Sequence, residues 1–162
     1  MLTAIGTVGA VIVSLWLALR STKIKGRATI DFKKIICCEF NSEDIVGVEV
    51  INTGSKPFKI ENISVYDKQL KSWLIIMPNY NHPYCAKLGQ VYLESETGLY
   101  IFTRDVFLAQ LKDKMNIADS TNCIGRLKKL RFVATANLGE KIAITPGKYF
   151  FEDFDKLCNS IN

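Results

Sequence analysis

The residue types most suited to chemistry gather in one short segment, Asn79-Tyr-Asn-His-Pro-Tyr-Cys85, which contains the only histidine of the chain. Histidine is the commonest general base in nucleophilic catalysis, and Cys85 could act as its nucleophile. A spacing of three residues is not typical of Cys–His dyads, however, and the more ordinary interpretation of His82 is an exposed loop residue. We therefore predict no catalytic residue and expect the protein not to be an enzyme.

The same segment has a spacing that suits zinc, since His82 and Cys85 are separated by two residues and Cys37-Cys38 could supply further thiolates. Neighbouring residues of a strand point to opposite faces, so Cys37 and Cys38 would not converge on one ion. The chain also lacks a glycine-rich phosphate-binding loop. The sequence thus predicts no metal site and no cofactor.

Binding is a second use for this segment, because loops on a rigid scaffold often carry recognition residues and tyrosine is favoured among them. The candidate recognition loop consists of Tyr80, His82 and Tyr84. The alternative is that these aromatic side chains fold back onto their own sheet.

Formal charge is distributed unevenly along the 162 residues. Residues 1–34 contain six basic groups and one acidic group, whereas the rest of the chain contains fifteen of each. The net charge of +5 therefore lies next to the N-terminus. Binding to duplex nucleic acid depends on neutralising phosphates, so the balanced remainder predicts no nucleic-acid partner.

The N-terminal segment, Leu2 to Leu19, has no charged residue and is followed by Arg20, Lys23, Lys25 and Arg27. Eighteen helical residues rise about 27 Å, close to the ~30 Å hydrocarbon core of a bilayer. The pattern predicts a transmembrane helix over residues 1–22, a basic juxtamembrane linker over 23–27 and a domain over 28–162. The four basic residues would bind the membrane surface, with the lipid bilayer as partner.

Basic residues that flank a membrane span stay on the cytoplasmic side. The sequence thus predicts a single-pass protein of the bacterial inner membrane, with the N-terminus outside and the domain in the cytoplasm. Five cysteines without a disulfide framework fit a reducing compartment.

Small residues recur every fourth position in the N-terminal segment, at Gly6, Ala10, Ser14 and Ala18. Residues at i and i+4 share a helix face, and a row of small side chains lets two helices approach closely. We expect self-association of the helix and a homo-oligomer, against the simpler alternative that apolar helices are rich in small residues.

Beyond residue 27 the apolar period changes from helical to two, which predicts strands. The predicted strands cover residues 28–33, 45–52, 58–66, 73–77, 91–94, 99–102, 129–137 and 141–145. A helix is expected after Thr103 and an amphipathic helix from Phe150 onward. Continuous apolar residues over 73–77 indicate a buried strand. Many short strands joined by glycine and asparagine turns favour an antiparallel β-sandwich with one or two short helices.

Three stretches carry a resemblance: Val-Glu-Val-Ile-Asn-Thr-Gly-Ser-Lys-Pro-Phe-Lys-Ile, Gly-Leu-Tyr-Ile-Phe-Thr-Arg-Asp-Val-Phe-Leu-Ala-Gln-Leu and Leu-Arg-Phe-Val-Ala-Thr-Ala-Asn-Leu-Gly-Glu-Lys. Together with the N-terminal segment, they resemble uncharacterised small bacterial membrane-anchored immunoglobulin-like proteins. Ala136-Asn137 stands where that group usually has an aspartate. The resemblance implies an immunoglobulin-like β-sandwich and no catalytic residues.

These expectations combine into a non-enzymatic membrane protein that presents a β-sandwich interaction or sensing domain to an unknown protein partner. The alternative is a membrane-disrupting effector, for example in phage defence, whose helix oligomerises when the domain binds a signal.

Overall fold

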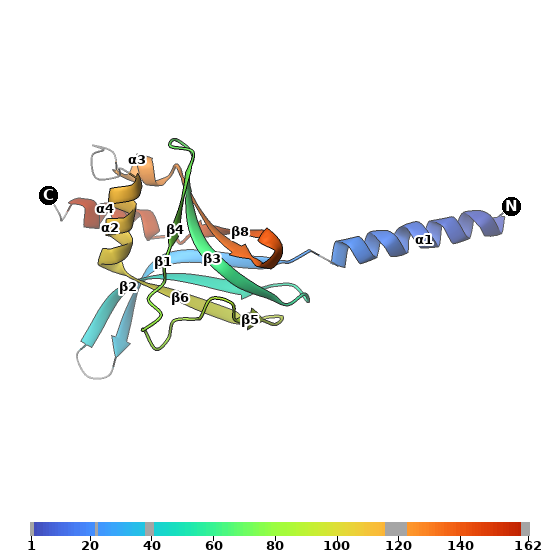
Figure 1. Ribbon diagram of the computed structural model, residues 1–162, viewed down its shortest axis with the longest axis horizontal. Helices are drawn as coiled ribbons and strands as arrows, with labels where there is room; N and C mark the ends of the chain where they lie inside the picture. The colour runs from blue at the N-terminus through green and yellow to red at the C-terminus, as the bar shows by residue number, and fades with distance from the viewer. Residues whose placement is uncertain (1, 22, 38–40, 116–122, 160–162) are drawn as a thin grey trace.

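The computed structural model describes residues 2–21, 23–37, 41–115 and 123–159. Its elements are α1 (Leu2–Ser21), β1 (Gly26–Cys37), β2 (Asn41–Asn52), β3 (Phe58–Asp67), β4 (Ser72–Ile76), β5 (Val91–Tyr92), β6 (Thr97–Thr103), α2 (Arg104–Met115), α3 (Cys123–Leu127), β7 (Leu130–Ala136), η1 (Asn137–Gly139), β8 (Lys141–Pro146) and α4 (Phe150–Asn159). The strands form a curled sheet, and α2, α3 and α4 gather at the end of it far from α1 (Figure 1).

The strands form one sheet in the order β4-β3-β7-β8-β1-β2-β6, and β5 pairs with the remaining part of β3. Neighbours are antiparallel except β1 and β8, which run parallel over Ala28–Ile30. The predicted mainly β composition is confirmed, but the immunoglobulin-like sandwich is wrong. A sandwich requires two sheets packed face to face, whereas here a single sheet curls into a half-barrel.

Helices fill the concave side of the half-barrel, which we call the inner face. Phe150 of α4 lies 5.3 Å from Phe32 and 5.8 Å from Phe132, measured between ring centres. Phe107 of α2 lies 6.3 Å from Phe132, so both helices join one aromatic core. The sequence predicts that the amphipathic helix from Phe150 onward covers an edge of the sandwich, whereas α4 packs on the inner face of the half-barrel.

No helix in the described part of the chain is both long enough and apolar enough to cross a membrane. The predicted transmembrane helix over residues 1–22 is therefore wrong, and so is the single-pass placement in a bacterial inner membrane with a cytoplasmic domain.

Candidate functional site

The predicted recognition loop lies along β6, the strand at one end of the sheet, and forms backbone hydrogen bonds with it. The Asn79 amide donates to the Ile101 carbonyl at 2.7 Å, and the Ala86 amide donates to the Leu99 carbonyl at the same distance. Further along, the Gly89 amide donates to the Ile60 carbonyl of β3 at 2.8 Å. Residues 77–90, which we call the edge loop, thus connect β4 to β5 and form backbone hydrogen bonds with both β6 and β3.

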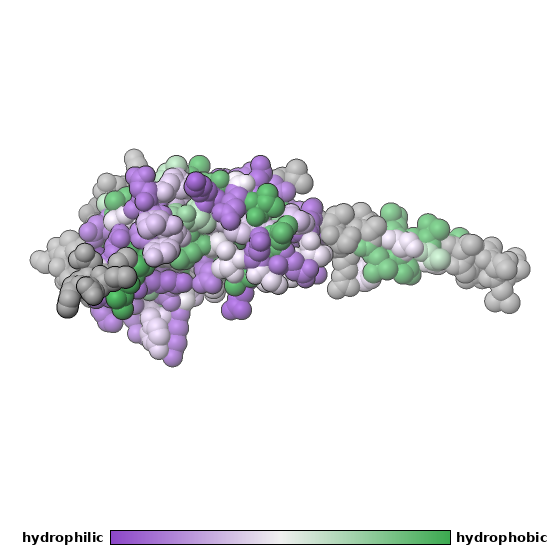
Figure 2. Space-filling view, turned by 90° about the horizontal axis from the view of Figure 1, so that it is seen from below, coloured by the Kyte–Doolittle hydropathy of each residue, from purple (hydrophilic) through white to green (hydrophobic). Residues whose placement is uncertain are grey.

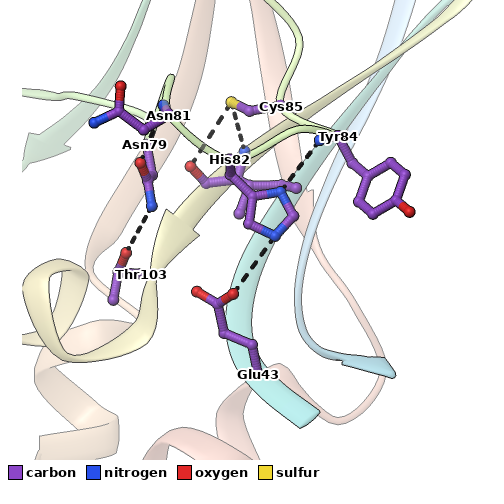
Figure 3. Close-up of polar contacts among 8 residues, drawn as sticks. Glu43, Asn79, Asn81, His82, Tyr84, Cys85 and Thr103 are labelled. Carbon is purple, nitrogen blue, oxygen red and sulfur yellow. Dashed lines mark hydrogen bonds and ion pairs between the residues drawn. The ribbon is translucent and has the colours of Figure 1, made fainter. Parts of the chain in front are cut away.

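His82 anchors the edge loop and is not the exposed loop residue that the sequence predicts, since only 8% of it is accessible. Its Nε2 lies 3.5 Å from Oε2 of Glu43 on β2, and its Nδ1 accepts a hydrogen bond from the Tyr84 amide at 3.3 Å (Figure 3). Both ring nitrogens are occupied. Of the predicted recognition residues, Tyr80 and Tyr84 are exposed and His82 has a structural position.

Cys85 points away from the imidazole of His82 (Figure 3). Its sulfur accepts a hydrogen bond from the Ile101 amide at 3.4 Å and lies 3.9 Å from the Ile101 carbonyl oxygen. Burial raises the pKa of the Cys85 thiol, and the backbone contact with Ile101 lowers it by less. A nucleophilic cysteine needs the opposite shift, because the thiolate is the reactive form.

Alkylation measures this thiol directly. At pH 8 we expect iodoacetamide to modify Cys85 at least tenfold more slowly in the folded protein than in urea, because burial disfavours the thiolate. Quantitative mass spectrometry of the peptide that contains Cys85 gives both rates. Modification faster in the folded state than in urea would instead identify an activated nucleophile.

The other predicted site residues do not join the edge loop. Lys23, Lys25 and Arg27 are exposed near the start of β1. The side chains of Arg20, Ala18, Cys37 and Cys38 lie outside the described residues, and so does the environment of Gly6. Among the described side chains, no group of three or more histidine, cysteine or acidic residues could hold a metal ion.

A different surface stands out on the convex, outer face of the sheet. The predicted buried strand is only half buried, because Ile76 points inward while Trp73 and Ile75 point outward with exposed fractions of 48% and 57%. Met77 continues the row and is also 57% exposed. The sequence does not reveal this surface, because residues 73–77 are all apolar. Inward and outward side chains therefore cannot be told apart by polarity.

Trp73 is held between two neighbours. The Tyr66 ring centre on β3 lies 4.8 Å from that of Trp73, and the Lys141 ammonium on β8 lies 4.5 Å from the Trp73 ring centre. Beside them is a hollow of about 220 Å³ lined by Asn62, Ser64, Trp73, Ile75, Thr135 and Lys141. We call Tyr66, Trp73, Ile75, Met77 and Lys141 the β4 face.

The edge of β4 is also open. Residues 72–76 pair with β3 on one side, and the structure gives them no strand on the other side among the described residues. Unpaired backbone groups on an edge strand are a template for another strand, and native proteins usually protect such edges with lysine, proline or a bulge. Ser72–Ile76 contains none of these residues, and a second chain could add to it.

Charge on this part of the outer face has one sign. The segments 62–66, 72–76, 131–135 and 141–145 contain Arg131 and Lys141 but no acidic residue. The β4 face therefore combines aromatic and aliphatic side chains with one cation, Lys141, and Arg131 and an open strand edge belong to the same region of the sheet. The sequence matches no protein-family model and no curated protein sequence.

Proposed function

We propose that this protein is a non-enzymatic interaction module that docks an extended segment of a partner protein along β4. The observation that carries the proposal is the exposure of Trp73, Ile75 and Met77 beside an unpaired strand edge. In strand addition, main-chain hydrogen bonds supply affinity and alternate side chains supply specificity. Arg131 and Lys141 favour a partner strand that carries acidic residues among its apolar ones.

The membrane-tethered form of this function, and the membrane-disrupting effector, both depend on a helix that crosses the bilayer, and the structure provides none among its described residues. Two residues of the β-rich domain, its histidine and Cys85, support a binding role over a catalytic one. Its histidine is used to hold the edge loop, and partial burial raises the pKa of its Cys85 thiol, so neither residue favours catalysis.

Selection from a random dodecapeptide library on the immobilised full chain tests the proposal. We expect the enriched peptides to alternate apolar residues and to carry acidic ones. Their affinity should fall at least tenfold in the double variant Trp73→Thr with Ile75→Lys, because aromatic anchors dominate such interfaces.

The matched control is Val91→Lys, which also places a lysine at an exposed apolar position, 54% accessible, on another strand. This variant should bind the selected peptides as the natural protein does. Peptides without strand alternation, or binding that survives the double variant with its fold intact by circular dichroism, would exclude β4 as the docking edge.

A second proposal concerns α1, whose large apolar side chains between residues 8 and 17 are all exposed. Figure 2 shows one such apolar face of the helix. The exposed fractions range from 54% for Val13 to 66% for Val11. A helix that is apolar all round is stable when another apolar surface covers it. Ala10 and Ser14 lie one turn apart on one side of α1, where a second copy of the helix could approach closely.

Disulfide trapping tests this assembly. Ala10→Cys and Ser14→Cys should each form dimers on mild oxidation, because a disulfide requires Cα atoms within about 7 Å. Ile12→Cys, on roughly the opposite side of the helix, should give about a tenth of that yield. Mass spectrometry of the linked peptide separates these dimers from those of the natural cysteines. Equal yields from all three positions would show that the small side chains do not form the contact.

A further inference from the structure

Three lysines lie in a row at the end of the sheet that is away from α1, beside α3 (Figure 1). Asp67, the last residue of β3, pairs with Ser72 of β4 on one side and with Leu130 of β7 on the other. Each lysine stands one residue beyond one of these paired residues, so the three occupy neighbouring positions across three strands. They are Lys68, Lys71 and Lys129, which we call the lysine row.

The turn between β3 and β4, which carries two of these lysines, is held by a buried side chain. Oδ1 of Asp67 accepts the amides of Gln69 and Leu70 at 2.7 and 3.2 Å. Oδ2 of Asp67 lies 2.7 Å from Nη2 of Arg126 on α3. Lys71 completes the turn with a φ of +51°, in the left-handed region. The backbone therefore fixes the positions from which these lysines extend.

The charge of the lysine row is not balanced by its surroundings. All three side chains are exposed, and none forms an ion pair with another residue in the described part of the chain. Residues 62–76 and 123–136 contain six basic residues and one acidic residue, Asp67, whose carboxylate is buried against Arg126. Like charges at neighbouring cross-strand positions repel one another, so an anionic group that binds the row relieves this repulsion.

The lysine row lies at only one end of the open edge of β4. A strand added to this edge runs about 4.8 Å from β4, so its residues beyond Ser72 come next to Lys71, with Lys68 one strand further away. At its other end, β4 continues into Met77 and Pro78, which have no charge. The surface offered to an added strand is therefore apolar along β4 and cationic at one end.

We propose that the lysine row binds a run of acidic side chains at the C-terminal end of the segment that docks along β4. Neighbouring strands in this sheet are antiparallel except β1 and β8, and an antiparallel partner presents its C-terminal end at Ser72. The inference rests on the proposed docking function. It narrows the partner to an extended segment whose alternating apolar residues are followed by carboxylates.

Parallel selections from the random dodecapeptide library test the inference, one on the natural full chain and one on the double variant Lys68→Gln with Lys71→Gln. We expect alternating apolar residues in the peptides from both proteins, and a C-terminal acidic run only in those from the natural protein. Alternation without that run, or a run that persists in the double variant, would overturn this inference and leave the docking function standing. Peptides without alternation from either protein would exclude both.

Calorimetric titration of a selected peptide measures the contribution of the row. Replacing the acidic run of the peptide by glutamines should weaken its binding to the natural chain about fivefold at low salt, because several exposed charge pairs are lost together. The same replacement should not change binding to the double variant. Equal weakening in both proteins would show that the carboxylates do not contact the row.

The matched control is Lys25→Gln with Lys87→Gln, which removes two exposed lysines outside the row and lowers the net charge by the same amount. This control should keep the fivefold difference between the acidic and the glutamine peptide. Loss of the difference in the control as well would indicate a general attraction to the positive charge of the protein, and would overturn the inference.

Discussion

Arg126→Met should lower the free energy of unfolding by about 3 to 5 kcal/mol, because it leaves a buried carboxylate without its cation. Arg126 Nη2 lies 2.7 Å from Oδ2 of Asp67, and the two side chains are 10% and 0% exposed. The other carboxylate oxygen accepts the amides of Gln69 and Leu70 at 2.7 and 3.2 Å. This pair joins the turn after β3 to α3. Urea denaturation followed by circular dichroism measures the change.

The exposed pair Asp153–Lys156 on α4 provides the control. Its atoms lie 3.0 Å apart, but the side chains are 37% and 75% exposed. Lys156→Met should therefore change stability by less than about 0.5 kcal/mol. In the double variant Asp67→Asn with Arg126→Met, the loss should be smaller than the sum of the single losses, since no charge stays buried. Additive losses would show that the two groups are not coupled.

Asn52→Ala should cost about 3 kcal/mol or more, because Asn52 serves three hydrogen bonds at once in a fully buried position. Its Nδ2 donates to the carbonyls of Lys56 and Tyr92, both at 3.0 Å. Its Oδ1 accepts the Gly54 amide at 2.9 Å. Truncation leaves two carbonyls and one amide without these partners. Thermal and urea unfolding should both shift.

Asn81→Ala tests whether the loss depends on burial. Asn81 is exposed on the edge loop, and its replacement should stay within about 0.5 kcal/mol of the natural protein. If Asn52→Ala were as mild as Asn81→Ala, the turn after β2 would not depend on the Asn52 side chain.

The local pattern of apolar and polar residues predicts the positions of the strands and of helices α2 and α4. Alternation over 58–66 matches β3, and the helix expected after Thr103 is α2, which begins at Arg104. The turn at Asn137–Gly139 is confirmed, with Gly139 at a φ of +74°. The stretch Asn52-Thr-Gly-Ser-Lys-Pro57 predicts the turn after β2, with a positive φ at Gly54 as its reason, and that reason is wrong. Gly54 has no positive φ there, and the Asn52 side chain organises the turn instead.

Sheet topology could not be predicted in the same way, because it depends on contacts between distant segments. β1 pairs with β8 more than a hundred residues later, and in parallel register. Short strands with frequent turns suit a sandwich and a half-barrel equally well. The choice between them is made by α2 and α4, whose phenylalanines fill the inner face and occupy the place of a second sheet.

The site was missed for a related physical reason. His82 carries the most conspicuous chemistry in the sequence, yet Glu43 and the Tyr84 amide use both of its ring nitrogens. Trp73 and Ile75 look like core residues, because their segment is apolar throughout. Their face is left uncovered because β4 lies at the end of the sheet, and the described part of the chain supplies no strand beyond it.

Hydrogen exchange tests most directly whether β4 is the docking edge. The natural full chain is exchanged with and without a saturating selected peptide. We expect amide exchange to slow in Ser72–Ile76 and to stay unchanged in β5, because an added strand protects only the backbone that it pairs with. Protection confined to any other strand, with Ser72–Ile76 exchanging as fast as in the free protein, would contradict the proposed function.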